Sequence, residues 1–263
     1  MPVEDDRGAP PPFGDVGTGE PVVLVTGSGA GGSTWHLQVP ALVAAGYRVL
    51  TPDHREHSAG GADDLVADLV RLIERVRLGP CRLVGTSLGA HVVQELLLAR
   101  PDLARQAVLL ATRGRADALR AAMVAAEREL LASGVVLPPG YAAVQRALQF
   151  LSPATLNDDV RLTDWLDLFE AFPPERATEL VDVAADRLDA YRAIRVPTLV
   201  IGFGDDLIAP PHLGREVAAA IPGARYMEIA DCAHYGYLER PEAVNSALLD
   251  FFAPPSAGRT PPT

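Results

Sequence analysis

The chain has 263 residues, enough for one globular domain with insertions, and its formal net charge of −11 argues against nucleic acid or an anionic membrane surface as a partner. Although 48% of the residues are hydrophobic, no apolar run approaches the roughly 20 residues that are needed to span a bilayer. The chain contains no lysine, which excludes Schiff-base chemistry and a phosphate-binding loop that ends in Gly-Lys.

Short apolar runs alternate with helical patterns along most of the chain. This alternation is typical of a mainly parallel sheet that helices cover on both faces. The expected strands are residues 22–26, 47–53, 81–86, 107–111, 198–203 and 225–230. The expected helices of this layer are residues 62–77, 88–100, 211–220 and 241–251. The sequence therefore predicts an α/β fold.

The alternation stops between residues 111 and 195. Helical patterns follow one another there over 116–133, 141–151, 160–172 and 182–192, and prolines separate them. We therefore expect an all-helical cap of residues 112–194, inserted into a core of residues 13–111 and 195–253. Residues 1–12 and 254–263 are rich in Pro, Gly and Ser and are expected to be disordered tails. The acidic, proline-rich start lacks the pattern of a secretory signal, so we expect a cytoplasmic protein.

A glycine-rich loop follows the first expected strand. Gly27, Gly29 and Gly32 satisfy G-x-G-x-x-G, and Asp53 ends the next strand at about the distance of a ribose-binding acid. An NAD(P)-binding reductase is therefore one alternative. Against it, Pro40 falls inside the segment where the dinucleotide-binding helix would run, and the catalytic lysine of such reductases is absent.

A second motif stands between the strand 81–86 and the helix 88–100. Gly85-Thr86-Ser87-Leu88-Gly89 is G-x-S-x-G in the strand-turn-helix context of a nucleophile elbow. The glycines have a steric reason, because a sharp turn that presents the serine leaves no room for side chains two residues away. The N–H of Leu88 at the helix N-terminus could stabilise a developing oxyanion.

A serine hydroxyl needs a base and an acid that orients the base. "GDDLIAP" places Asp205 and Asp206 after the fifth expected strand, and His234 follows the sixth. All three groups thus follow carboxyl ends of strands, in the chain order Ser, Asp, His. We predict Ser87 as nucleophile, His234 as base and Asp206, rather than Asp205, as the orienting acid.

On these residues the chain resembles the α/β-hydrolase superfamily over roughly residues 21–252. "GDDLIAP" resembles the acid turn of that family and "CAHYGYLERPEAV" its histidine loop. "LLATRGR" and "HLQVPALVAAGYRV" are similar to a subgroup found beside actinobacterial natural-product pathways. The resemblance implies an α/β-hydrolase fold with a helical lid and a serine hydrolase that needs no cofactor, within secondary metabolism.

The loop after the first strand departs from the family pattern. The family usually has His-Gly where this chain has Thr26-Gly27. By position in the family, the oxyanion hole is formed by the backbone N–H groups of Ser28 and Leu88, with Gly29 as the alternative to Ser28.

Other reactive side chains have simpler interpretations. His54 and His57 lie in a post-strand loop without the one-turn helical spacing of paired zinc ligands, so we predict no metal site. Cys81 and Cys232 are expected to be reduced, structural thiols. His91, one helical turn beyond Ser87, is expected to be a packed or hydrogen-bonded histidine.

The leading functional hypothesis is hydrolysis of an ester or thioester of a mainly apolar acyl substrate, free or carrier-bound, through an acyl-enzyme. The cap contains an apolar stripe in which Trp165 and Phe169 are candidate substrate contacts, with core packing as the alternative. Neither Arg146 nor Arg161 of the cap indicates a dedicated anion site, and acids flank Arg161, so a neutral or weakly charged substrate is expected. A C–C bond hydrolase would use the same triad. A non-hydrolytic cyclase or a small-molecule receptor on this fold also remains open, and the oligomeric state is not predicted.

Overall fold

The computed structural model of the protein describes residues 11–54, 61–172 and 185–253. Within these residues, seven strands form one sheet in the order β1-β3-β2-β4-β5-β6-β7. Every neighbouring pair is parallel except β1 with β3. The strands are β1 (Phe13–Val16), β2 (Glu20–Val25), β3 (Tyr47–Pro52), β4 (Cys81–Thr86), β5 (Ala104–Leu110), β6 (Thr198–Phe203) and β7 (Arg225–Ile229). The predicted mainly parallel sheet is confirmed.

Strand β1 is the one described strand that the sequence pattern does not predict. It pairs antiparallel with β3, with Phe13 opposite Pro52. The carbonyl of Pro12 accepts a hydrogen bond from the N–H of Asp53 at 2.9 Å, which continues this pairing. Residues 1–10 of the expected tail 1–12 lie outside the described part of the chain, whereas Pro12 is hydrogen-bonded to the edge of the sheet.

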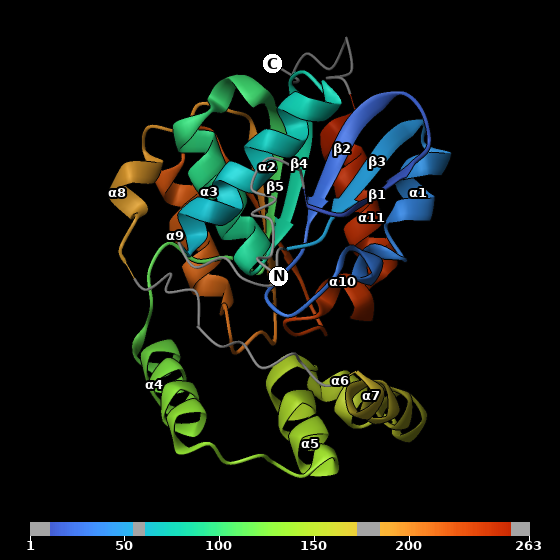
Figure 1. Ribbon diagram of the computed structural model, residues 1–263, viewed down its shortest axis with the longest axis vertical. Coiled ribbons are helices and arrows are strands. Elements are labelled where there is room, and N and C mark those ends of the chain that lie inside the picture. The colour runs from blue at the N-terminus through green and yellow to red at the C-terminus, as the bar shows by residue number, and fades with distance from the viewer. Residues whose placement is uncertain (1–10, 55–60, 173–184, 254–263) are drawn as a thin grey trace, which may run out of the picture.

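Helices cover both faces of the sheet (Figure 1). One face carries α2 (Ala62–Val76), α3 (Leu88–Ala99), α8 (Leu188–Tyr191) and α9 (Pro211–Ala220). The other carries α1 (Val39–Ala44), α10 (Gly236–Glu239) and α11 (Pro241–Phe252). Short 3-10 turns occupy η1 (Gly32–Trp35) and η2 (Pro101–Leu103).

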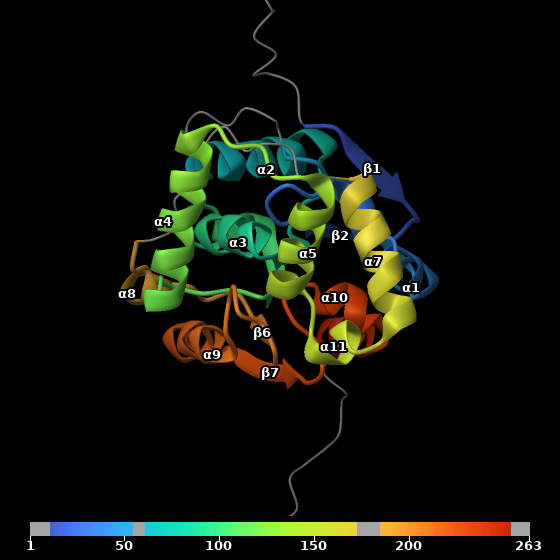
Figure 2. The same cartoon turned by 90° about the horizontal axis from the view of Figure 1, so that it is seen from below.

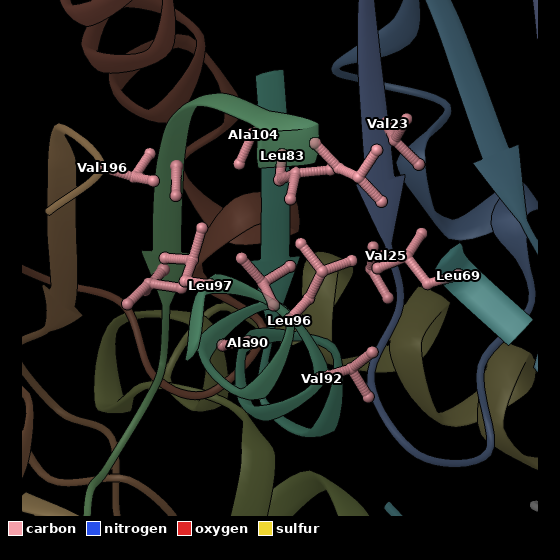
Figure 3. Packing of buried hydrophobic residues seen from close by; sticks show 14 of the residues in the cluster. Val23, Val25, Leu69, Leu83, Ala90, Val92, Leu96, Leu97, Ala104 and Val196 are labelled. Atoms are coloured by element: carbon pink, nitrogen blue, oxygen red, sulfur yellow. The ribbon is translucent and has the colours of Figure 1, made fainter. Parts of the chain in front are cut away.

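The alternation of side chains along β2 explains why two layers form. Val23 and Val25 belong to the core on the α3 side, whereas Val22 and Leu24 belong to the core on the α11 side. Figure 3 shows Val23 and Val25 packed toward Leu69 of α2 and toward α3. Burying each such side chain contributes about 1.5–3 kcal/mol, so strands that are apolar on both faces are stable only between two helical layers.

The cap follows β5 and consists of α4 (Ala118–Ser133), α5 (Pro139–Phe150), α6 (Pro153–Leu156) and α7 (Asp159–Ala171). These helices lie beyond the carboxyl ends of the strands (Figures 1 and 2). Helices α5 and α7 share a small core of Ala143, Ala147, Leu151 and Phe169. The predicted helical insertion is confirmed, and α6 is an additional turn that the Ser152 side chain caps by accepting the N–H of Thr155. Among the described helices, none combines the length and the hydrophobicity of a membrane-spanning segment.

The helix expected over residues 182–192 is much shorter than predicted. Residues 182–184 lie outside the described residues, and the helix that follows, α8, is a single turn. It begins late because the Asp186 carboxylate accepts the N–H of Leu188 at 3.0 Å, and the N–H of Arg187 donates to the carbonyl of Gly114. Tyr191 is fully buried among α3 and α9, so this turn packs with the helical layer of the core.

Candidate active site

Ser87 lies at the sharp turn between β4 and α3. Its φ of 53° and ψ of −117° lie outside the regions that non-glycine residues favour, so this conformation costs energy. The N–H of Ser87 donates to the carbonyl of Leu110 on β5 at 3.0 Å, which holds the turn against the neighbouring strand. Thr86 and Leu88 are buried, whereas Ser87 is partly exposed. The chain thus presents this hydroxyl at the tip of a strained turn.

The glycines on either side of Ser87 are required sterically. A Cβ on Gly85 would lie 2.4 Å from the carbonyl oxygen of Gly89, and a Cβ on Gly89 would lie 2.2 Å from that of Val25. Backbone cannot yield at these distances, so α3 packs against β2 and β4 only with glycine at both positions. The steric reason inferred from the G-x-S-x-G pattern therefore applies here.

His234 and Asp206 form a buried pair. His234 Nδ1 lies 2.8 Å from Asp206 Oδ2, and the two residues are 4% and 2% exposed. The other carboxylate oxygen, Oδ1, accepts the N–H groups of Ile208 at 2.8 Å and Ala209 at 2.9 Å. These three contacts hold the carboxylate of Asp206 in one orientation. Asp206 can therefore fix the ring orientation of His234 and stabilise an imidazolium.

The three predicted triad residues follow β4, β6 and β7, whose carboxyl ends lie at one edge of the sheet. Asp206 and His234 are in contact, whereas no hydrogen bond joins Ser87 to His234 among the described residues. Catalytic hydrogen bonds are often long in ligand-free sites and tighten with substrate. Asp205, by contrast, makes no bond to His234; burial, Asp231 and Glu239 raise the pKa of its carboxyl.

The loop after β2 lies against the elbow. A Cβ on Gly27 would lie 3.4 Å from Cβ of Ser87, so the loop backbone approaches the nucleophile closely. The Thr26 hydroxyl donates to the carbonyl of Ala30 at 2.9 Å, and His54 Nε2 lies 2.7 Å from the carbonyl of Thr26. Ser28 is exposed at the turn that these bonds shape.

Asp53 and His54 are both engaged within this loop region. The carboxylate of Asp53 accepts the N–H of Gly32 at 2.6 Å, so the acid considered for a ribose holds the glycine-rich loop itself. No long helix starts at Gly32, because a 3-10 turn gives way to α1 at Val39. The described residues contain no group of three side chains fit for a metal, and His57 lies outside them.

The cap contacts the histidine loop through aromatic rings. Phe150 of α5 stacks on Tyr235 at 5.0 Å between centroids and meets His234 edge-on at 5.4 Å. Trp165 and Phe169 of α7 pack on each other and on Tyr235. Phe169 is 4% exposed, so it lies in the core of the cap, whereas Trp165 is only partly buried.

Arg146 has a role inside the cap that the sequence does not suggest. Its guanidinium donates to the Tyr235 hydroxyl at 2.9 Å and lies 4.4 Å from the ring centroid of Phe169. It also donates to the carbonyl of Phe172 at 3.1 Å. This arginine therefore joins α5 to the residue that follows His234.

Glu239 is a buried acid beside the histidine loop that the sequence does not reveal. It is 4% exposed, and its carboxylate accepts four hydrogen bonds. The donors are the N–H of Ala233 at 2.7 Å, the N–H and hydroxyl of Ser152 at 3.0 and 2.7 Å, and the hydroxyl of Thr155 at 2.6 Å. In the sequence Glu239 resembles a surface residue near a helix start, so no local pattern reveals it.

His91 and the two cysteines are buried. Burial, followed by the charges of Arg113 and Arg187, lowers the pKa of His91 to about 3, so its ring is neutral at pH 7. Its Nε2 atom has no hydrogen-bond partner among the described residues. Cys81 and Cys232 are free and buried, as expected of structural thiols, and burial raises the pKa of both to about 12.

This fold and site define an α/β hydrolase. A family model described as "Alpha/beta hydrolase family" matches residues 22–247, and the chain therefore belongs to that family. The chain is 49% identical over 253 residues to the putative non-heme bromoperoxidase BpoC of Mycobacterium tuberculosis, covering 92% of this chain and 97% of that protein. The crystal structure of that protein from strain H37Rv superposes with a TM-score of 0.87 at 48% identity, over 92% of this chain and 94% of that one.

Two further relatives carry hydrolase names. The putative carbamate hydrolase RutD of Azorhizobium caulinodans is 29% identical over 89% of this chain and 92% of its own length. A thermophilic esterase of Thermogutta terrifontis, solved with malate bound, has a TM-score of 0.76 at 26% identity, covering 91% of this chain and 92% of that one.

Proposed function

We propose that this protein is a cofactor-independent serine hydrolase that cleaves an ester or thioester through an acyl-enzyme. The observation that carries the proposal is the buried His234–Asp206 pair at the same sheet edge as Ser87 in its strained turn. Acyl transfer needs a nucleophile, a base and an acid that orients the base, and these residues have the required chemistry.

In the first half-reaction, Ser87 Oγ attacks the carbonyl carbon while His234 Nε2 takes the hydroxyl proton. The backbone N–H groups of Leu88 and Ser28 stabilise the oxyanion of the tetrahedral intermediate. Collapse breaks the bond to the leaving oxygen or sulfur, which receives the proton from His234. Water then repeats the sequence on the acyl-enzyme and releases the acid. Asp206 holds the His234 tautomer throughout.

The proposed substrate is an acyl compound with a substantial apolar part, bound between the sheet and the cap. Trp165 remains a candidate contact because it is partly exposed beside Tyr235. Phe169, as a second candidate, would act chiefly by supporting Trp165, since it is itself buried. We further propose a cytoplasmic setting, which suits the two free cysteines, and a role within secondary metabolism, which rests on the motif resemblance.

The direct test is hydrolysis of p-nitrophenyl butyrate by the wild type and by Ser87→Ala, His234→Ala and the double variant. Each single variant should lose at least about 10⁴-fold in kcat, and the double variant little more, because triad members act as a unit. Ser33→Ala and His36→Ala, at exposed positions, are the matched controls. Near-normal turnover by Ser87→Ala would refute the proposal, and absence of turnover by the wild type would favour a receptor or cyclase.

The name of BpoC favours one second candidate. If hydrogen peroxide replaces water as the acceptor, the acyl-enzyme yields a peracid, and peracid with bromide and a proton yields the carboxylic acid and hypobromous acid. This reaction needs the same triad. The test is bromination of monochlorodimedone in the presence of acetate, hydrogen peroxide and bromide. Bromination by the wild type that is lost in Ser87→Ala would support this candidate, whereas bromination retained in Ser87→Ala would refute it.

A further inference from the structure

Arg113 is a buried cation without a described partner. The residue is 7% exposed, and its Nε atom is among the buried atoms that lack a hydrogen-bond partner. No carboxylate of the described residues lies within ion-pair distance of it, although several act on it from farther away. Buried arginines are almost always paired, because an uncompensated charge inside a protein is costly. An anionic ligand is one group that would satisfy such a donor.

Arg113 lies at the catalytic edge of the sheet. It follows β5 by three residues, and the last residue of β5, Leu110, accepts the N–H of Ser87. The hydroxyl of its neighbour Thr112 donates to Gln94 of α3 at 2.8 Å, which fastens this segment to the helix that begins at the elbow. The charge of Arg113 also lowers the pKa of His91, which lies one turn beyond Ser87 on α3.

The charge of Arg113 persists at neutral pH. Burial, followed by the charge of Arg120, lowers its pKa to about 10, so the guanidinium remains protonated at pH 7. Arg120 of α4 has an unpartnered, buried Nε of its own. The positive charge of Arg120 thus acts on Arg113, and an anion bound at Arg113 would offset this repulsion.

The acids around Arg113 already have other partners. Asp206 is held by His234 and by two backbone N–H groups. Asp117 accepts the N–H of Arg120 at 2.8 Å as the cap of α4, and Glu127 lies 3.5 Å from Arg120. None of them neutralises Arg113 at close range.

We propose that the substrate carries a carboxylate on its acyl part, and that the guanidinium of Arg113, which lies at the same edge of the sheet as Ser87, binds this carboxylate. A planar guanidinium matches a carboxylate in a bidentate geometry. The inference rests on the proposed acyl-transfer function and names its substrate class. It differs from the neutral or weakly charged substrate that the sequence alone leads us to expect.

The kinetic test compares two esters that differ only at the far end of the acyl chain: mono-p-nitrophenyl adipate, with a carboxylate, and p-nitrophenyl hexanoate, with a methyl group. The wild type should have the higher kcat/KM for the adipate ester. Arg113→Met should lower the adipate-to-hexanoate ratio by about 10- to 100-fold, and Arg113→Lys by less. Arg115→Met is the matched control, since Arg115 is 34% exposed and pairs with Glu216 at the surface.

The unfolding temperature separates a ligand-binding arginine from a structural one. Arg113→Met should unfold at the same or a higher temperature, because it removes an unpaired buried charge, and adipate should stabilise the wild type but not the variant. A lower unfolding temperature for Arg113→Met, or an unchanged ester ratio, would overturn the proposal while leaving the hydrolase intact. If the wild type cleaves neither ester, the hydrolase proposal fails. The carboxylate site is then tested by adipate alone, and an equal increase in the unfolding temperature of the wild type and of Arg113→Met would overturn it.

Discussion

The carboxylate of Glu239 accepts a hydrogen bond from the backbone N–H of Ala233 at 2.7 Å, so a buried acid holds the residue that precedes His234. Its other oxygen accepts hydrogen bonds from Ser152 and Thr155 at the start of α6. One side chain therefore connects the cap to the histidine loop, and the position of the candidate base depends on it.

Replacing Glu239 should disturb both stability and rate. Glu239→Gln puts an amide donor among N–H and hydroxyl donors, which should cost about 1–3 kcal/mol of the free energy of unfolding. The amide can accept a hydrogen bond through only one of its two atoms, so either Ala233 or Ser152 loses its acceptor. The fold-decrease in kcat for p-nitrophenyl butyrate should therefore be larger than the fold-change in KM. Urea unfolding and steady-state kinetics measure these effects, with exposed Glu242→Gln as control. Equal behaviour of the two variants would show that Glu239 does not position the loop.

The two aspartates of "GDDLIAP" should differ sharply. Asp206→Asn changes the group that bonds His234 Nδ1, so it should favour the wrong tautomer and lose on the order of 10³–10⁴-fold in kcat. Asp205→Asn touches neither His234 nor the bonds of Asp206 to the turn and should stay within a few-fold of the wild type. The reverse order of activity would mean that the orienting acid is one residue away from the predicted position.

His91 should make stability depend on pH. Its ring stays neutral in the folded protein, because burial and two arginines lower its pKa to about 3. Below about pH 6.5 the unfolded chain takes up a proton at His91, whereas the folded protein does not. As the pH is lowered from 6.5 to 3, the free energy of unfolding should therefore decrease by up to about 1.4 kcal/mol per pH unit. In His91→Gln the unfolded chain cannot take up this proton, so the free energy of unfolding should depend less steeply on pH, by the contribution of up to one proton. Urea unfolding of the wild type and of His91→Gln between pH 7 and 4.5 tests this prediction, and parallel stability profiles of the two proteins would contradict it. His54, whose pKa is also lowered, contributes equally to both proteins.

The length of the acyl chain should affect the specificity constant. Each methylene that contacts an apolar wall adds up to about 0.8 kcal/mol of binding, nearly fourfold in kcat/KM. A series of neutral p-nitrophenyl esters from two carbons upward should therefore rise before it levels off. If acetate is the best substrate and kcat/KM falls with length, the site is small and the rings of Trp165 and Phe169 serve the cap core alone.

The elements that could be predicted from the sequence are those with local patterns. The elbow at Ser87 was found because glycines, an apolar strand and a helix flank it within twenty residues. Strand β1, in contrast, reads Phe-Gly-Asp-Val, without alternation, and it exists because β3 offers an open edge. Helix α1 was missed because Pro40 suggested a break, whereas a proline is well tolerated in the first turn.

The site residues that were missed depend on contacts far apart in the chain. Glu239 is an ordinary acid in its own segment and becomes an anchor only when Ser152, 87 positions earlier, folds onto it. Arg113 resembles a loop arginine beside Gly114, and its burial becomes visible only in the folded structure. Patterns in one sequence carry no information on such pairings, so charge burial could not be anticipated.

Covalent labelling reports whether Ser87 is a nucleophile that His234 activates. The wild type is treated with a fluorophosphonate, digested and mapped by mass spectrometry, alongside His234→Ala and the exposed-site control His36→Ala. We predict one phosphonylated residue, Ser87, in the wild type and the control, with labelling at least about a hundredfold slower in His234→Ala. A wild-type protein that stays unlabelled, or that is labelled at another serine, would contradict the assignment of this site.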